Sequence, residues 1–89
     1  MKPNFIGRLA SESERKTPDP IDTFVGARLR MRRLSLGINE DELAHMIGAT
    51  ISDVQKFETG ESRISAQQLF RISRILKVPM SYFFERGPM

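Results

Sequence analysis

One stretch near the middle of the chain places hydrogen-bonding side chains at helical spacing. If residues 51–59 form a helix, at about 100° per residue its outward side presents four polar side chains: Ser52, Gln55, Lys56 and Thr59. Val54 then lies at the centre of the buried side, with Phe57 and Glu58 next to it. The outward set has one cation and no carboxylate. Lysine can donate to guanine, glutamine can pair with adenine and hydroxyls can contact bases or phosphates, so this face suits the major groove of DNA.

Two helix-start signals place a tight turn immediately before this stretch. Asn39 can cap a short helix, with Glu42 three residues later as its capping-box partner, and Gly48 ends that helix. Thr50 and Asp53 repeat the same pattern at the start of the next helix, which assigns Asp53 to the cap rather than to a ligand. Only a tight turn separates the two helices. This is the spacing of a helix-turn-helix.

Apolar periodicity predicts the helices that must support this pair. A first helix is expected to run roughly over residues 22–34 and to end at Gly37. One stripe of this helix and its end should face the core: Val25, Leu29, Arg33 and Leu36. After the helix-turn-helix, Ser65 and Gln68 form a third capping box ahead of another apolar stripe, made of Leu69, Ile72, Ile75 and Leu76.

A last short helix is expected near the end of the chain. Pro79 fits its first turn, and four bulky side chains follow: Met80, Tyr82, Phe83 and Phe84. Helical spacing cannot bury three consecutive aromatic side chains on one face, so at least one should remain exposed. The pattern therefore predicts an all-α domain of five helices, with no strand.

Length and composition restrict the class of protein. The 89 residues, 39% of them hydrophobic, suit one small domain with a modest core. Fourteen basic against eleven acidic residues give a net charge of +3, so an anionic partner would be bound through the placement of charge rather than its amount. The absence of cysteine, of a signal-peptide pattern and of an apolar run of about 18 residues predicts a soluble, cytoplasmic protein without a membrane partner.

The residue types leave little material for catalysis. The chain has one histidine, His45, which stands without ligand-type neighbours and is expected at the surface, and it has one tyrosine and no cysteine. We therefore expect no metal, no cofactor, no small-molecule substrate and no enzymatic activity.

Residues 1–20 are expected to form a flexible arm ahead of a domain that comprises residues 21–89. The arm shows no sustained helical or strand period and ends in a breaker, Pro18-Asp19-Pro20. The chain stops soon after its last predicted helix, so no separate effector-binding domain is expected.

Taken together, these segments resemble the Cro and lambda-repressor type of helix-turn-helix regulators. The likeness covers roughly residues 21–84 and rests on three stretches in the right order: VGARLRMRR followed by LG, ELAHMIGATISDVQKFETG, and RISAQQLFRISRILKVPMSYFF. The resemblance implies a compact lambda-repressor-like domain whose third helix enters the major groove, in a transcriptional regulator that is by family habit a repressor. One such helix reads only a few base pairs, so a homodimer on a palindromic operator is expected.

The resemblance also assigns roles to individual residues. Base contacts are implied for five positions: Thr50, Ile51, Ser52, Gln55 and Lys56. Phosphate contacts are implied for three arginines: Arg30, Arg33 and Arg63. Arg33 and Glu58 are further implied to form a partly buried ion pair, which agrees with their places on the buried sides of their helices. Arg28 and Arg32 are left open between a specific role and merely solubilising their helix.

One position departs from the family pattern. The family commonly has a glutamine at the start of the second helix, where its amide and the helix N-terminus hold a DNA phosphate, but this chain has Glu40. A carboxylate repels a phosphate, although the helix dipole favours it by about 0.3–1 kcal/mol. The acidic run Glu40-Asp41-Glu42 leaves a second hypothesis open, in which a protein-interaction or antitoxin-like module keeps the fold and presents this run to a basic partner.

Overall fold

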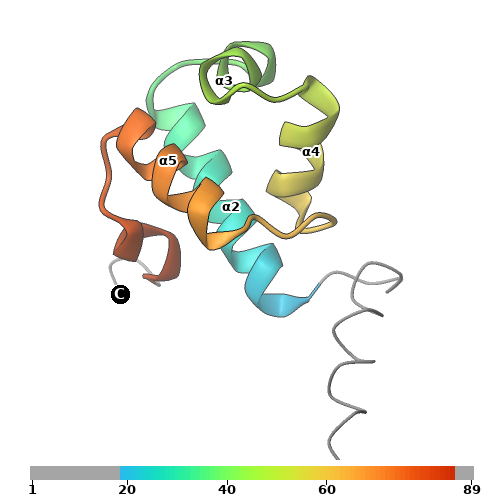
Figure 1. The fold of residues 1–89 in the computed structure, drawn as a ribbon, viewed down its shortest axis with the longest axis vertical. Coiled ribbons are helices and arrows are strands. Elements are labelled where there is room, and N and C mark those ends of the chain that lie inside the picture. Colours follow the sequence, from blue (N-terminus) through green and yellow to red (C-terminus); the bar gives the residue numbers. More distant parts are fainter. Residues whose placement is uncertain (1–18, 86–89) are drawn as a thin grey trace, which may run out of the picture.

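The computed structural model describes residues 19–85, and the regular secondary structure in this range is helical (Figure 1). Four α-helices are followed by a 3-10 helix: α2 (Pro20–Ser35), α3 (Glu40–Ile47), α4 (Ile51–Thr59), α5 (Ala66–Leu76) and η2 (Met80–Phe84). The predicted all-α class is confirmed, with the fifth predicted helix present as the 3-10 turn. None of these helices is long and apolar enough to cross a membrane. Most of the predicted arm, residues 1–18, lies outside the described residues.

Both ends of α2 differ from the prediction. Asp19 is the N-cap, accepting a hydrogen bond from the backbone N–H of Ile21 at 2.8 Å, and Pro20 is the first residue of the helix. Proline suits this position because its φ is already helical and its missing N–H would have had no partner there. The end of the predicted breaker therefore supplies the start of the helix. Leu36 is the C-cap and is 41% exposed, so its predicted place on the buried stripe was wrong.

Capping boxes start the next three helices, as the sequence predicted. Each cap side chain accepts from the backbone N–H three residues later, and the residue there reaches back to the backbone N–H of the cap. The donor–acceptor distances lie between 2.7 and 3.1 Å in three pairs: Asn39 with Glu42, Thr50 with Asp53, and Ser65 with Gln68. Because these bonds satisfy N–H groups that have no partner within the helix, they define where each helix begins.

The core joins all five elements. Each element contributes at least one buried hydrophobic side chain, and five of these side chains have almost no exposure: Leu29, Leu43, Val54, Leu76 and Phe83. α2 packs against α4 and η2, whereas α3 packs against α4 and α5. Figure 1 shows the short turn through which α3 leads into α4. The position of α4 is thus determined by both α2 and α3.

Two arginines of α2 hold the C-terminal part of the domain. The Arg28 Nε donates to the Tyr82 carbonyl at 2.8 Å, and the guanidinium lies 4.0 Å from the centroid of the Tyr82 ring. The Arg32 Nε donates to the Leu76 carbonyl at 2.9 Å, at the end of α5, where a cation is favoured by the helix dipole. Arg28 is buried, so of the two alternatives that the sequence left open, merely solubilising the helix was wrong for Arg28.

Candidate nucleic-acid interface

The turn between α3 and α4 has the geometry that its glycine predicted. Gly48 has φ 71°, in the left-handed region, and the backbone N–H of Ala49 donates to the Ala44 carbonyl at 2.8 Å. Glycine adopts this conformation without the steric penalty that a Cβ brings. Thr50 then caps α4, so the direction of the chain changes within a few residues. The two helices form a helix-turn-helix.

α4 divides into a buried and an exposed face. Val54, Phe57 and Glu58 are buried, as the helical spacing predicted. The five residues predicted to contact bases all lie at exposed positions on α4 or its cap: Thr50, Ile51, Ser52, Gln55 and Lys56. Thr59 is also exposed, but its hydroxyl donates to the Lys56 carbonyl at 3.2 Å. The polar face of α4 is therefore free of core contacts along its length.

A buried ion pair links α2 to α4. The Arg33 guanidinium donates from Nε to Glu58 Oε2 at 2.7 Å and from Nη2 to Glu58 Oε1 at 3.1 Å, and the two side chains are 7% and 4% exposed. Nη1 donates to the Ile38 carbonyl at 3.1 Å. The hydrogen bonding of Arg33 to the Glu58 carboxylate is the main reason that the pKa of Arg33 is raised, with burial acting in the opposite direction and the charges of Glu58 and Glu40 adding to the rise.

The three arginines predicted to contact phosphates have different surroundings. The Arg33 guanidinium is buried, and three of its five N–H groups donate to Glu58 and to the Ile38 carbonyl. Arg30 is exposed. The Arg63 Nε lies 3.2 and 3.3 Å from the two carboxylate oxygens of Asp22, and its Nη2 lies 3.9 Å from Asp19, although the Arg63 side chain stays partly exposed.

A groove follows the exposed face of α4. Eight residues line it: Arg30, Glu40, Ser52, Gln55, Lys56, Glu58, Thr59 and Glu61. The sequence predicted the α4 residues and placed Glu40 near the DNA phosphates, but it did not predict that Glu61 also lines this groove. Glu40 Oε1 accepts a hydrogen bond from Gln55 Nε2 at 3.1 Å, and Glu40 Oε2 lies 4.0 Å from Arg33 Nη2. Glu40 and Gln55 are 15 residues apart on different helices, so no local pattern signalled this contact.

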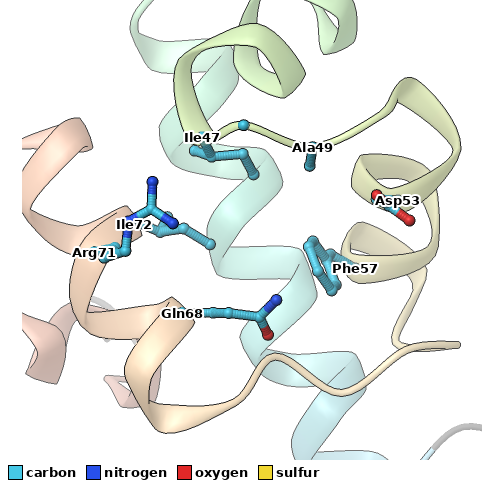
Figure 2. A pocket seen from close by; sticks show the side chains of 8 residues that line it. Ile47, Ala49, Asp53, Phe57, Gln68, Arg71 and Ile72 are labelled. Carbon is cyan, nitrogen blue, oxygen red and sulfur yellow. The ribbon is translucent and has the colours of Figure 1, made fainter.

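A second hollow, of about 230 Å³, lies between the end of α3, α4 and α5 (Figure 2). The Asp53 carboxylate and the Gln68 amide, which line this hollow, already form hydrogen bonds in capping boxes. Ile47, Phe57 and Ile72 supply apolar wall, and Arg71 stands at the edge. The groove along α4 therefore remains the candidate site. Among the described residues, no cluster of three or more histidine, cysteine or acidic side chains could hold a metal ion.

The fold and the site define a helix-turn-helix domain, and comparison with known proteins gives the family. The chain belongs to the HTH_3 helix-turn-helix family, whose model matches residues 29–83. The match runs from the middle of α2 into η2 and includes both helices of the helix-turn-helix. Membership of this family confirms the resemblance to the Cro and lambda-repressor type.

Curated relatives are named as transcriptional regulators. An uncharacterized HTH-type transcriptional regulator of Sinorhizobium medicae (strain WSM419) is 46% identical over 74 residues, which cover 83% of this chain and 53% of the relative. An uncharacterized transcriptional regulator in the ATPase CF(0) region of Rhodospirillum rubrum is 43% identical over 79 residues, which cover 85% of this chain and 73% of the relative. The chain spans about half the length of the Sinorhizobium medicae relative.

Solved structures share the fold. The clp gene regulator ClgR from C. glutamicum superposes with a TM-score of 0.69 at 21% identity, covering 74% of this chain and 86% of that protein. The restriction-modification controller protein C.AhdI from Aeromonas hydrophila superposes with a TM-score of 0.65 at 26% identity, covering 70% of this chain and 94% of that protein. The arrangement of helices is therefore one that known regulators use.

Proposed function

We propose that the protein is a sequence-specific DNA-binding transcriptional regulator that reads the major groove with α4. The observation that carries this proposal is the exposed polar face of α4, which follows α3 after a tight turn and is anchored to α2 by a buried ion pair. An α-helix fits the major groove, and hydroxyl, amide and ammonium groups are the partners that base edges require. The relatives named as transcriptional regulators and the solved restriction-modification controller support the same function.

Individual roles follow from the chemistry of the face. Gln55 and Lys56 supply the polar contacts to base edges, with Ser52 adjacent to them, and the apolar Ile51 can meet a thymine methyl group. The Thr50 hydroxyl, which accepts the cap hydrogen bond, can still donate to a base or a phosphate. Arg30 and Arg63 are the proposed phosphate contacts. Arg33 is assigned first to the ion pair with Glu58, because its guanidinium is buried and donates to Glu58 and to the Ile38 carbonyl, and its predicted phosphate contact stays a prediction.

The protein is further proposed to act as a homodimer on a palindromic operator. Two recognition helices must lie about 34 Å apart to enter successive major grooves on one face of DNA. Phe84 is 55% exposed, and with Ile21 and Met80 it lines an apolar groove between the start of α2, the start of α5 and η2. A second copy that covers this surface would remove a cluster of large apolar side chains from water. By family habit such a dimer represses transcription, and its place is the cytoplasm, where prokaryotic DNA lies.

The alternative, a protein-interaction or antitoxin-like module, depends on a free acidic run at the start of α3. Glu40 instead accepts from Gln55, and Glu42 accepts from the backbone N–H of Asn39 in the capping box. Of this run, Asp41 is exposed and takes no part in the capping box. Two of the three carboxylates thus serve the domain itself, which favours the DNA-binding proposal.

Titration with duplex DNA across a range of salt concentrations, followed by selection from a random duplex pool, tests the proposed function. A binding constant that falls steeply with salt, together with recovery of one palindromic motif, is the expected result. Indifference to DNA at low salt would overturn the proposal in favour of the interaction module. Binding with a steep salt slope but without any selected motif would contradict sequence-specific reading by α4.

A further inference from the structure

The carboxylate of Glu40, on α3, forms a hydrogen bond with Gln55 on the proposed recognition face of α4. Its Oε1 accepts a hydrogen bond from Gln55 Nε2 at 3.1 Å. We propose that Glu40 is a positioning residue for Gln55, and that by holding the Gln55 amide in one orientation it determines which base Gln55 pairs with. This inference rests on the proposed function, in which α4 reads the major groove.

Glu40 is itself held in place. It is the first residue of α3, directly after the Asn39 cap, and its second carboxylate oxygen lies 4.0 Å from Arg33 Nη2. Arg33 is in turn bonded through two nitrogens to Glu58. The contacts therefore run from Glu58 on α4 through α2 and α3 and return to Gln55 on α4. A side chain at the end of such a chain of contacts is much less free to rotate than a solvated glutamine.

The orientation matters because a glutamine amide has a donor end and an acceptor end. An ionised carboxylate can only accept hydrogen bonds, so it binds the NH₂ end of Gln55 and never the oxygen. This leaves Oε1 and one N–H of Gln55 for DNA. Adenine presents an amino group beside an acceptor and cytosine presents an amino group, whereas the major-groove edges of guanine and thymine present acceptors. Because only adenine and cytosine offer a donor for Oε1, a base contact that uses Oε1 of Gln55 favours an amino-bearing base.

A glutamine in place of Glu40 removes this constraint. A glutamine side chain both donates and accepts, so the Gln55 amide could pair with it in either orientation. Glu40→Gln also removes repulsion between a carboxylate and the DNA phosphates, which raises affinity for every sequence. For this reason the decisive readout is the base preference at one position and not the overall affinity.

The experiment measures base preference in the wild type and three variants: Glu40→Gln, Gln55→Ala and the double variant. After site selection from a random duplex pool, binding to all single-base changes of the selected site is titrated. The wild type is expected to favour an amino-bearing base at one position by about tenfold or more. Both single variants should lose most of that preference, and the double variant should lose no more. Asp41→Asn is the matched control, because it removes a charge from the same turn of α3 without touching the Gln55 amide.

Two results would overturn the inference. The first is that Glu40→Gln keeps the full base preference of the wild type. The second is that Glu40→Gln changes the base preference as much in the Gln55→Ala background as in the wild type, since Glu40 would then act without Gln55. If the wild type selected no motif, the proposed function itself would be contradicted, and this inference would be contradicted with it. Independently of DNA, the side-chain amide protons of Gln55 should shift toward the values of a solvated glutamine in Glu40→Gln. Unchanged amide resonances would contradict the hydrogen bond itself.

Discussion

At the scale of the residue, Arg33 and Glu58 determine how firmly α4 is seated. Both side chains are almost fully buried, and each supplies the groups that satisfy the other. Taking two charges out of water is expensive, so the pair as a whole contributes little net stability compared with apolar residues. Removal of one partner is different, because the remaining charge is left buried without compensation. The pair therefore makes the position of α4 sensitive to either residue.

Glu58→Ala should destabilise the domain by about 3–5 kcal/mol for this reason. Urea unfolding monitored by circular dichroism measures the change in free energy. Glu61→Ala is the matched control, since Glu61 is exposed and its loss should alter stability by no more than about 0.5 kcal/mol. If the two variants unfolded at the same urea concentration, the pair could not be buried as described.

The pH dependence of the pair follows from the direction of the Arg33 shift. Hydrogen bonding to Glu58 raises the pKa of Arg33 in the folded state. A raised pKa means that the stabilisation from this group is fully present below the unfolded-state pKa and is lost only as the pH rises through the folded-state pKa. Because both lie at strongly alkaline pH, Arg33 should contribute no slope to stability around neutral pH. The double variant Arg33→Met with Glu58→Met leaves neither buried charge behind, and a change in its stability slope around neutral pH relative to the wild type would contradict this.

At the scale of the element, the crossing of α2 and α4 brings backbone against backbone. A Cβ added at Gly26 would lie 2.2 Å from the Phe57 carbonyl oxygen and 2.8 Å from that of Glu58. These carbonyls belong to the last turn of α4, so Gly26 sets how closely the recognition helix approaches α2. No motif in the sequence signalled this role, because the contact depends on a helix that lies far along the chain.

Gly26→Ala should therefore destabilise the domain by about 1–3 kcal/mol or more through overpacking. Helix propensity alone acts in the opposite direction, since alanine inside a helix is favoured over glycine by roughly 0.5–1 kcal/mol. Thermal and urea unfolding of Gly26→Ala give the sign. The reverse change at the next residue, Ala27→Gly, is the control. Because Ala27 is exposed, this change measures the effect of helix propensity on stability without any crowding against α4. A more stable Gly26→Ala variant would show that α2 and α4 do not touch at this position.

The elements also show which parts of the fold the sequence could predict. The starts of three helices were predicted because a capping box is a local pattern of two side chains and two backbone groups. The start of α2 was displaced because Asp19 and Pro20 are equally compatible with a cap or with a breaker until a helix is seen to follow. The exposure of Leu36 could not be predicted from spacing, since the helix ends before the stripe reaches it.

The site divides in the same way. The exposed face of α4 follows from helical geometry. The Arg33–Glu58 pair was implied by the family resemblance, and helical geometry agreed with it because a charged residue on an apolar stripe needs a buried partner. The bond between Glu40 and Gln55 and the attachment of Arg63 to Asp22 depend on how separate helices are packed, which periodicity does not encode. The DNA contacts predicted for all of these residues stay predictions: Thr50, Ile51, Ser52, Gln55, Lys56, Arg30, Arg33 and Arg63.

At the scale of the whole molecule, an apolar surface that includes the exposed Phe84 lies beside η2. The sequence predicted that three consecutive aromatic side chains could not all be buried, and the structure buries Phe83 while leaving Phe84 exposed. Tyr82 is half-buried, with its hydroxyl donating to the Arg28 carbonyl and its ring against the Arg28 guanidinium. Burying one phenylalanine side chain is worth about 1.5–3 kcal/mol, so two symmetric contacts would support only a weak dimer that forms mainly on DNA.

Phe84→Ser should leave the fold intact and turn cooperative binding to a palindrome into weaker, independent binding of half-sites. The exposed side chain contributes little to the core, whereas a dimer contact would lose most of its apolar area. Sedimentation of the free protein, with titration of a full and a half operator, measures both effects. Cooperativity that persisted in Phe84→Ser would place the dimer contact at another surface.

The central claim is that α4 contacts the base edges of DNA, while basic residues outside α4 contact the DNA phosphates. Site selection with Lys56→Ala and Arg63→Ala, after circular dichroism has shown both variants to be folded, tests this most directly. Lys56→Ala is expected to weaken binding to the preferred site by about 1–3 kcal/mol and to relax the choice of base at one position. Arg63→Ala is expected to weaken binding to all sequences about equally and to lower the salt slope by about one, with the motif unchanged. An unchanged motif in Lys56→Ala, together with an altered motif in Arg63→Ala, would contradict the assignment of α4 as the reading helix.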